Sequence, residues 1–137
     1  MSRIRRSVRT VMALTLASGL LLAGAGPALA GDTGPTLRGP EGDWRTRTLG
    51  VTQTVTFDDD GRVYGDTGCN RFTGGYTTKG DRMTIGPLAS TLRACPQPIM
   101  DAEAIFLNKL QSTVAFRATA KKLRLFTPKD MTVYRAN

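Results

Sequence analysis

Short runs in which apolar and polar residues alternate recur along most of this chain, and they limit the folds it can adopt. In the stretch 51–57, Val51, Val55 and Phe57 point one way and three threonines point the other, which predicts a half-buried strand. The pattern predicts about seven or eight short strands in a mostly β, antiparallel sheet that curls or closes into a small barrel-like form to protect its edges. The further extended stretches are 62–65, 72–78, 83–85, 88–94, 114–119, 123–127 and 131–135.

One helix is expected among these strands. Asp101 is a suitable N-cap for a helix over 102–112, and two prolines, Pro96 and Pro98, close the extended stretch before it. The broad apolar face of this helix comprises Ala102, Ile105, Phe106, Leu107 and Leu110.

Glu103 lies within the apolar face of the predicted helix, which leaves two interpretations. It can be an acid favoured by the positive end of the helix dipole in the first turn. Alternatively, it can be a partly buried carboxylate held by Arg71, Arg93 or free backbone N–H groups, because a buried acid needs a partner. Both interpretations favour a structural role over a catalytic one, since acid–base chemistry needs a second positioned group.

The first 30 residues have the features of a secretory signal peptide. Arginines at 3, 5, 6 and 9 precede an apolar stretch over 11–23, and Ala28-Leu29-Ala30 fits a cleavage site. The apolar stretch is shorter than the roughly 20 residues that a membrane span needs. We therefore expect a secreted, periplasmic or otherwise extracytoplasmic protein, exported by the general secretory route or, less in keeping with the residues after Arg5-Arg6, by the twin-arginine route.

The rest of the chain is expected to form a glycine- and proline-rich flexible leader over 31–42 and one domain over 43–137. Four of the 19 basic residues lie in the first 30 and none of the 11 acidic ones does, so the remaining 15 basic residues give a net charge of +4. This charge is ordinary for a soluble domain, and we expect no nucleic-acid partner. We also expect a monomer without a transmembrane span after cleavage.

The composition argues against the common catalytic and metal sites. The chain contains no histidine, which removes Ser–His and Cys–His nucleophile systems and the commonest metal ligand. With two cysteines and no histidine, a structural zinc site lacks ligands. We therefore expect no enzyme activity, no metal and no cofactor.

Cys69 and Cys95 are the only cysteines. Export would place them where a disulfide persists, and closing a loop of this length would stabilise a small domain. Their wide spacing is unlike a Cys-x-x-Cys redox pair. A disulfide is favoured, with two buried free thiols or a reactive pair as alternatives.

Two charged clusters have functional interpretations. The run Asp58-Asp59-Asp60-Gly61 could suggest calcium, but its acids are consecutive rather than alternate, so a solvated turn is favoured. In the last hairpins, alternation predicts a basic outer face that could bind an anionic partner or envelope surface, unless it is simply a solvated sheet face. This candidate partner surface comprises Arg117, Lys122, Arg124, Phe126 and Tyr134.

A set of motifs, taken in order, resembles the META domain, also called the heat-inducible HslJ-like family. The resemblance covers about Asp43 to Tyr134, nearly all of the chain after the predicted signal peptide. The motifs are Trp44; Phe57; Gly65-x-x-Gly68-Cys69-Asn70-Arg71-Phe72-x-Gly74-x-Tyr76; Ile85-Gly86-Pro87-Leu88-Ala89-Ser90-Thr91-x-x-Ala94-Cys95; Glu103-x-x-Phe106-Leu107-x-x-Leu110; and Leu123-x-Leu125.

This resemblance implies a barrel-like sheet with one packed helix in a bacterial envelope or secreted protein. It also implies an association with stress and no characteristic enzyme activity. The chain lacks the lipid-anchoring cysteine of many members. We expect a non-catalytic domain with a binding or stress-response role toward an unknown protein or envelope component. The alternatives are a secreted proteinase inhibitor, or a carrier of a lipid or hydrophobic ligand that would need an apolar cavity.

Overall fold

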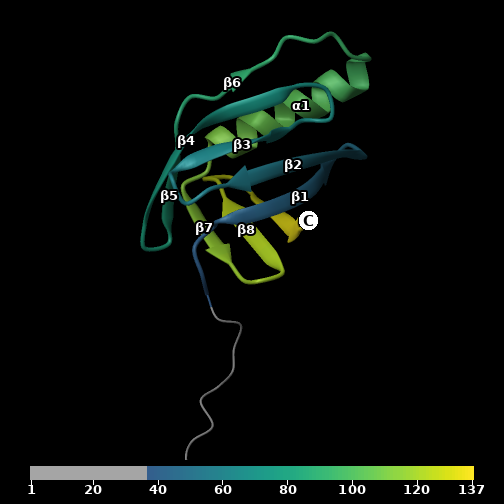
Figure 1. Cartoon of the computed structure of the whole chain (residues 1–137). Helices are drawn as coiled ribbons and strands as arrows, with labels where there is room; N and C mark the ends of the chain where they lie inside the picture. The colour runs from purple at the N-terminus through teal and green to yellow at the C-terminus, as the bar shows by residue number, and fades with distance from the viewer. Residues whose placement is uncertain (1–36) are drawn as a thin grey trace, which may run out of the picture. The chain divides into compact units, whose positions relative to one another are not determined.

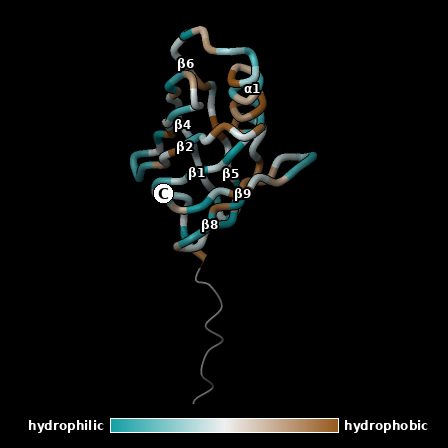
Figure 2. Tube along the Cα trace, turned by 90° about the vertical axis from the view of Figure 1, so that its right-hand side faces the viewer, coloured by the Kyte–Doolittle hydropathy of each residue, from teal (hydrophilic) through white to brown (hydrophobic). Residues whose placement is uncertain are grey.

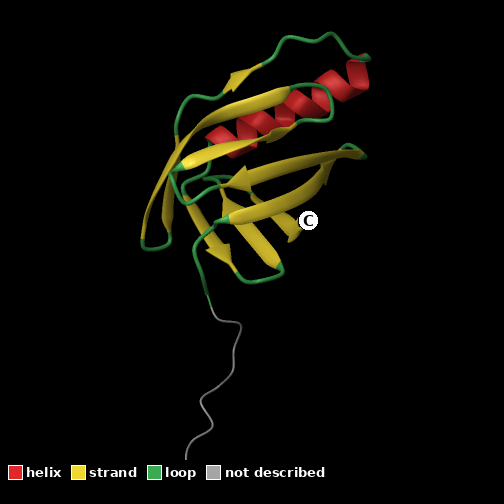
Figure 3. Cartoon of the chain, in the orientation of Figure 1, coloured by secondary structure: helices red, strands yellow, loops and turns green. Residues whose placement is uncertain are grey.

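The computed structural model describes residues 37–137, so the predicted signal peptide and residues 31–36 of the expected leader lie outside the described residues. Nine strands and one helix occur in this part of the chain (Figures 1 and 3). The strands are β1 (Gly42–Thr48), β2 (Val51–Phe57), β3 (Arg62–Asp66), β4 (Arg71–Lys79), β5 (Arg82–Ile85), β6 (Ala89–Ser90), β7 (Ala115–Ala118), β8 (Lys122–Phe126) and β9 (Met131–Ala136), and the helix is α1 (Gln97–Gln111).

Eight of these strands form a closed antiparallel barrel. Neighbouring strands follow the order β3-β2-β1-β9-β8-β7-β5-β4, and pairing between β3 and β4 closes the ring. The short strand β6 pairs with β4 outside the ring and forms an edge. The predicted fold class, a small antiparallel barrel-like sheet with one packed helix, is confirmed.

The barrel wall has two weak seams. Strands β1 and β9 pair through only Trp44↔Ala136 and Arg45↔Arg135. Strands β5 and β7 share one residue pair, Arg82↔Ala115. At both seams the strands pair over few residues, so few backbone hydrogen bonds hold the wall together there.

The core lies between the barrel wall and one face of α1. Phe106 of the helix lies between the two sides, with ring centroids 5.6 Å from Phe72 of β4 and 6.5 Å from Tyr134 of β9. Trp44 and Leu110 are almost completely buried in the same cluster. Figure 2 shows hydrophobic and hydrophilic residues alternating along the strands, as expected when one face packs and the other meets solvent.

The helix begins earlier than predicted. It starts at Gln97 rather than after Asp101, and Pro98 lies in its first turn. Proline fits there because the first N–H groups of a helix have no intrahelical partner. Asp101 is therefore an internal residue, whose Oδ1 accepts a hydrogen bond from Gln97 Nε2 at 2.7 Å.

Three further details differ from the sequence-based expectation. Strand β1 was not predicted, although its residues alternate in exposure around the buried Trp44. Within the stretch 88–94, only Ala89–Ser90 forms a strand. The part of the expected leader that is described contacts the domain, since Arg38 pairs with Ala118 and Pro40 accepts a hydrogen bond from the Trp44 indole.

Candidate functional site

A buried polar cluster lies where the β3–β4 connection meets the first half of α1. Glu103 is 9% exposed, and its carboxylate accepts hydrogen bonds from the Thr67 hydroxyl and from Asn70 Nδ2, the latter at 3.1 Å to each oxygen. Thr67 and Asn70 are themselves buried. The interpretation of Glu103 as a buried carboxylate fits this geometry, but its predicted side-chain partners do not. Neither Arg71 nor Arg93 forms an ion pair with it among the described residues.

The same asparagine holds the exposed segment before the helix. Asn70 Oδ1 accepts hydrogen bonds from Arg93 N at 2.7 Å and from Thr91 Oγ1 at 2.9 Å. Its Nδ2 also donates to Arg93 O at 3.3 Å. One amide group therefore fixes the backbone or side chain on both sides of Leu92, and Glu103 fixes the amide group in turn.

The two cysteines lie beside this cluster. Their Sγ atoms are 2.04 Å apart, and the bond joins the β3–β4 connection to the segment before α1. Gly68, next to Cys69, has a φ of +90° and leaves no space for a side chain, because a Cβ would lie 2.4 Å from Val51 Cγ1. The local backbone therefore explains why a glycine precedes the cysteine.

The predicted basic face exists in part. Arg117, Lys122 and Arg124 are exposed on β7 and β8, and Phe126 is half-buried. Tyr134 does not belong to this face. It is 1% exposed and pairs with Leu123, so its side chain points into the core.

The register of β9 explains this correction. The outward residues of β9 are Met131, Val133 and Arg135, which pair with Phe126, Arg124 and Lys122 respectively. Met131 and Val133 are 44% and 39% exposed. The inward and outward sides of this strand are therefore the reverse of those predicted, and Arg135 takes the place of Tyr134 on the basic face.

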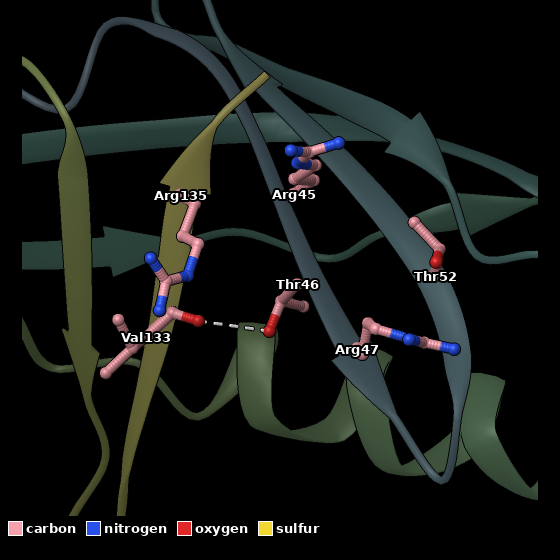
Figure 4. A pocket seen from close by; sticks show the side chains of 6 residues that line it. All are labelled: Arg45, Thr46, Arg47, Thr52, Val133 and Arg135. Atoms are coloured by element: carbon pink, nitrogen blue, oxygen red, sulfur yellow. Dashed lines mark hydrogen bonds between the residues drawn. The ribbon is translucent and has the colours of Figure 1, made fainter.

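This basic face continues across the weak seam onto β1, where an open groove lies. The groove has a volume of about 600 Å³ and is lined by residues of β1, β2 and β9. Figure 4 shows the two sides of the seam, with the Thr46 hydroxyl donating a hydrogen bond of 3.1 Å to the Val133 carbonyl. The lining residues are Arg45, Thr46, Arg47, Thr52, Val133 and Arg135.

The cations at this groove have no acidic partner within the described residues. Arg45 lies directly opposite Arg135, which lies opposite Lys122 on its other side. The ion pairs found in residues 37–137 are Arg62–Asp58 and Lys109–Asp130, and neither involves the groove. Like charges on directly opposed strand positions are destabilising. An anion bound between them would relieve this repulsion.

The aspartate run forms a turn. Asp58 accepts hydrogen bonds from Arg62 N at 2.8 Å and Arg62 Nε at 3.1 Å, which closes the connection between β2 and β3. Asp59 and Asp60 are exposed. Among the residues that the structure describes, no group of three or more possible ligands is placed to hold a metal ion.

Comparison with known proteins gives a family for this fold. A family model for the META domain matches residues 36–137. The chain belongs to the META domain family. No curated protein matches this META domain.

Solved structures share its fold at low sequence identity. An NMR structure of a protein from Burkholderia xenovorans has a TM-score of 0.56 and 22% identity, over 69% of this chain and 79% of that one. A crystal structure of a duf4847 family protein from Bacteroides vulgatus has a TM-score of 0.52 and 15% identity, over 62% of this chain and 59% of that one. These similarities show the fold alone.

The structure places the META motif residues in two groups. The first group is buried in the core and comprises Trp44, Phe72, Tyr76, Phe106 and Leu110. The second group surrounds the polar cluster and comprises Gly68, Asn70, Thr91 and Glu103. Gly74 allows Leu88 to pack closely against the backbone of β4, because a Cβ at position 74 would lie 2.7 Å from Leu88 Cδ2. Arg71 is exposed and participates through its backbone N–H, which donates to Thr91 Oγ1 at 3.1 Å.

Sequence reasoning missed Thr67 of the polar cluster and all the residues that line the groove, Arg135 among them. Thr67 completes the polar cluster but has no motif of its own. Arg45 and Arg47 line the groove, and their alternation with Trp44 was the signal that could have placed them on the outer face of a strand. Their proximity to Arg135 depends on a strand pairing across nearly the whole domain.

Proposed function

We propose that this META domain is a non-catalytic binding protein that acts outside the cytoplasm and binds an acidic protein partner at the groove between β1 and β9. The observation that carries this proposal is the direct opposition of Arg45 and Arg135 beside Lys122, with no ion pair to any of them within residues 37–137. Complementary charge speeds association and selects partners of opposite sign.

The non-catalytic part of the proposal has support in the buried polar cluster. The carboxylate oxygens of Glu103 already accept hydrogen bonds from Thr67 and Asn70, and the cluster holds a loop. These hydrogen bonds give Glu103 a structural role, which is in keeping with a non-catalytic domain. Extracytoplasmic location draws support from the signal-peptide pattern, and a stress-response role draws support from the family.

The carrier alternative has less support. It needs an apolar cavity, whereas Trp44, Phe57, Phe106 and Tyr134 pack together in the barrel interior. These side chains occupy the space that a hydrophobic ligand would need. The proteinase-inhibitor alternative draws support from a different part of the molecule, the segment Thr91–Cys95.

No helix in the part of the chain that the structure describes is long and apolar enough to cross a membrane. The partner class can be tested with purified protein. A fluorescent oligo-glutamate peptide is the probe, with oligo-lysine as the charge control and anionic lipid vesicles as a separate arm. We expect binding to the oligo-glutamate peptide that weakens as salt rises, because salt screens exposed charges.

The variant Arg45→Glu/Arg135→Glu should weaken binding of the acidic peptide by roughly 10-fold or more, since it replaces attraction by repulsion at the groove. The matched control is Lys79→Glu/Arg82→Glu, which makes the same change in net charge on the exposed β4–β5 hairpin. If both variants lose binding equally, net charge explains the binding, and the groove is not the binding site. Binding to vesicles but not to the peptide would reassign the partner to a membrane surface.

A further inference from the structure

The segment Thr91–Cys95, between β6 and α1, presents one large apolar side chain to solvent. Leu92 is 98% exposed, more than any other large hydrophobic residue in the part of the chain described. A single exposed leucine is ordinary on a protein surface. The unusual feature is the way in which the residues on either side of it are held.

A buried side chain braces this segment from below. Asn70 is 2% exposed, and its amide group accepts from Arg93 N and Thr91 Oγ1 while donating to Arg93 O. Glu103 fixes the orientation of the amide group. The backbone on both sides of Leu92 is therefore tied to the domain, whereas its side chain is not.

Covalent and backbone bonds complete the brace. The disulfide to Cys69 anchors Cys95 at the end of the segment. At its start, Thr91 N donates to Arg71 O at 3.0 Å. A loop fixed in this way loses little conformational entropy when a partner binds it, which is the physical basis of tight binding by a preorganised loop.

The strand before Leu92 has a free edge. β6 is the last strand in the sheet order, and among residues 37–137 it pairs only with β4. Because the N–H of Thr91 points toward β4, strand alternation directs the N–H and C=O of Ser90 away from it. These groups can pair with an extended strand of another protein, as in β-strand addition.

From these observations we propose that Ser90–Cys95 is an inhibitory loop for serine endopeptidases with an apolar primary specificity pocket, and that Leu92 enters this pocket. Such enzymes bind an extended peptide, choose substrates by the side chain before the scissile bond, and form standard-size interfaces with rigid inhibitors. This site lies apart from the arginine-lined groove and does not depend on the acidic-partner proposal.

The brace also explains how the loop would resist cleavage. The enzyme's serine Oγ attacks the Leu92 carbonyl carbon, the bond from Leu92 C to Arg93 N breaks, and the enzyme's histidine gives the serine proton to the Arg93 amine. Asn70 Oδ1, 2.7 Å from Arg93 N, keeps the new amine beside the acyl group. The amine can then attack the ester, return a proton to the histidine, expel the serine and restore the peptide bond before water reacts.

The first test is a change of specificity. The disulfide-bonded chain should inhibit chymotrypsin or subtilisin, and Leu92→Arg should lose this inhibition and gain inhibition of trypsin, each by roughly 30-fold or more, as expected for a central interface residue. Leu37→Arg is the matched control, because Leu37 is also an exposed leucine at 65% exposure. It should leave the inhibition constants unchanged.

The second test addresses the brace without unfolding the domain. Thr91→Val removes the hydroxyl bonded to Asn70 and should speed cleavage of the Leu92–Arg93 bond, observed by mass spectrometry, by about 10-fold. Rapid cleavage of the original chain at this bond, or no inhibition of either protease at micromolar protein, would overturn the proposal. Inhibition that Leu92→Arg leaves unaltered would also overturn it, because another residue would then enter the pocket.

Discussion

At the scale of single residues, the most informative side chain is Glu103. Its position on the apolar face of a helix was evident from the sequence, and it is buried among neutral donors rather than beside an arginine. Buried polar groups need hydrogen bonds, and neutral donors meet this need when they are fixed in place. Asn70 is fixed because it also binds the backbone of Arg93. Helix and loop are thus joined through one carboxylate.

Replacing Glu103 tests this description. Glu103→Gln puts an amide NH₂ against two donors, Thr67 Oγ1 and Asn70 Nδ2, so one buried donor loses its acceptor. We expect a loss of about 1–3 kcal/mol in the free energy of unfolding, measured with urea. Asp60→Asn, an exposed turn change, is the control and should alter it by less than about 0.5 kcal/mol. Equal effects would show that Glu103 is solvated.

At the scale of elements, the start of α1 shows where local rules mislead. Asp101 has the residue type of an N-cap, but the helix begins at Gln97, with Pro98 in the first turn and no side-chain cap. A preference for aspartate at helix starts is a weak preference that tertiary context overrides. Here Pro98 in the first turn is the local signal that agrees with the observed start, and the disulfide at Cys95 anchors the chain just before it.

The helix start at Gln97 leads to a prediction about Asp101. As an internal residue that accepts a hydrogen bond from Gln97, it contributes at most about 0.5 kcal/mol, the size of a surface pair one turn apart. Asp101→Ala should therefore lower the free energy of unfolding by no more than this amount in urea denaturation. A loss of about 1 kcal/mol or more is typical of a removed N-cap, and it would indicate that the helix begins after Asp101 instead.

At the scale of the whole molecule, barrel closure decides which tyrosines are buried. Burial raises the pKa of Tyr76 to about 12, with the negative charges of Glu41 and Asp58 adding to the effect. Burial also raises the pKa of Tyr134 above its ordinary value. The folded state therefore keeps both phenol protons at a pH where the unfolded chain releases them.

This difference in pKa makes the free energy of unfolding depend on pH. The contribution of both tyrosines is complete below pH 10, their ordinary pKa, and is lost as the pH rises through the folded values. We expect the urea midpoint to fall above pH 10, and Tyr134→Phe to make this fall shallower. Phenolate absorbance follows the ionisation of the tyrosines, and circular dichroism follows unfolding. Ionisation of Tyr134 in a fully native spectrum would contradict the inward placement of its side chain.

The sequence by itself determined the strand-rich class, the single helix and the family. These follow from alternation, turn residues and motif order, all of which are local along the chain. It also indicated that Glu103 could be buried. Alternation assigned two faces to β9 but could not say which is inside, because Val133 and Tyr134 are both apolar enough to pack.

Only the tertiary structure decided that question and the sites that depend on it. The register of β9 with β8 places Tyr134 opposite the buried Leu123, and the pairing of β9 with β1 brings Arg45 opposite Arg135. The brace around Leu92 likewise joins the β3–β4 connection, an edge strand and the helix start. Contacts between residues so far apart in the chain depend on the register and closure of the sheet, which no local pattern specifies.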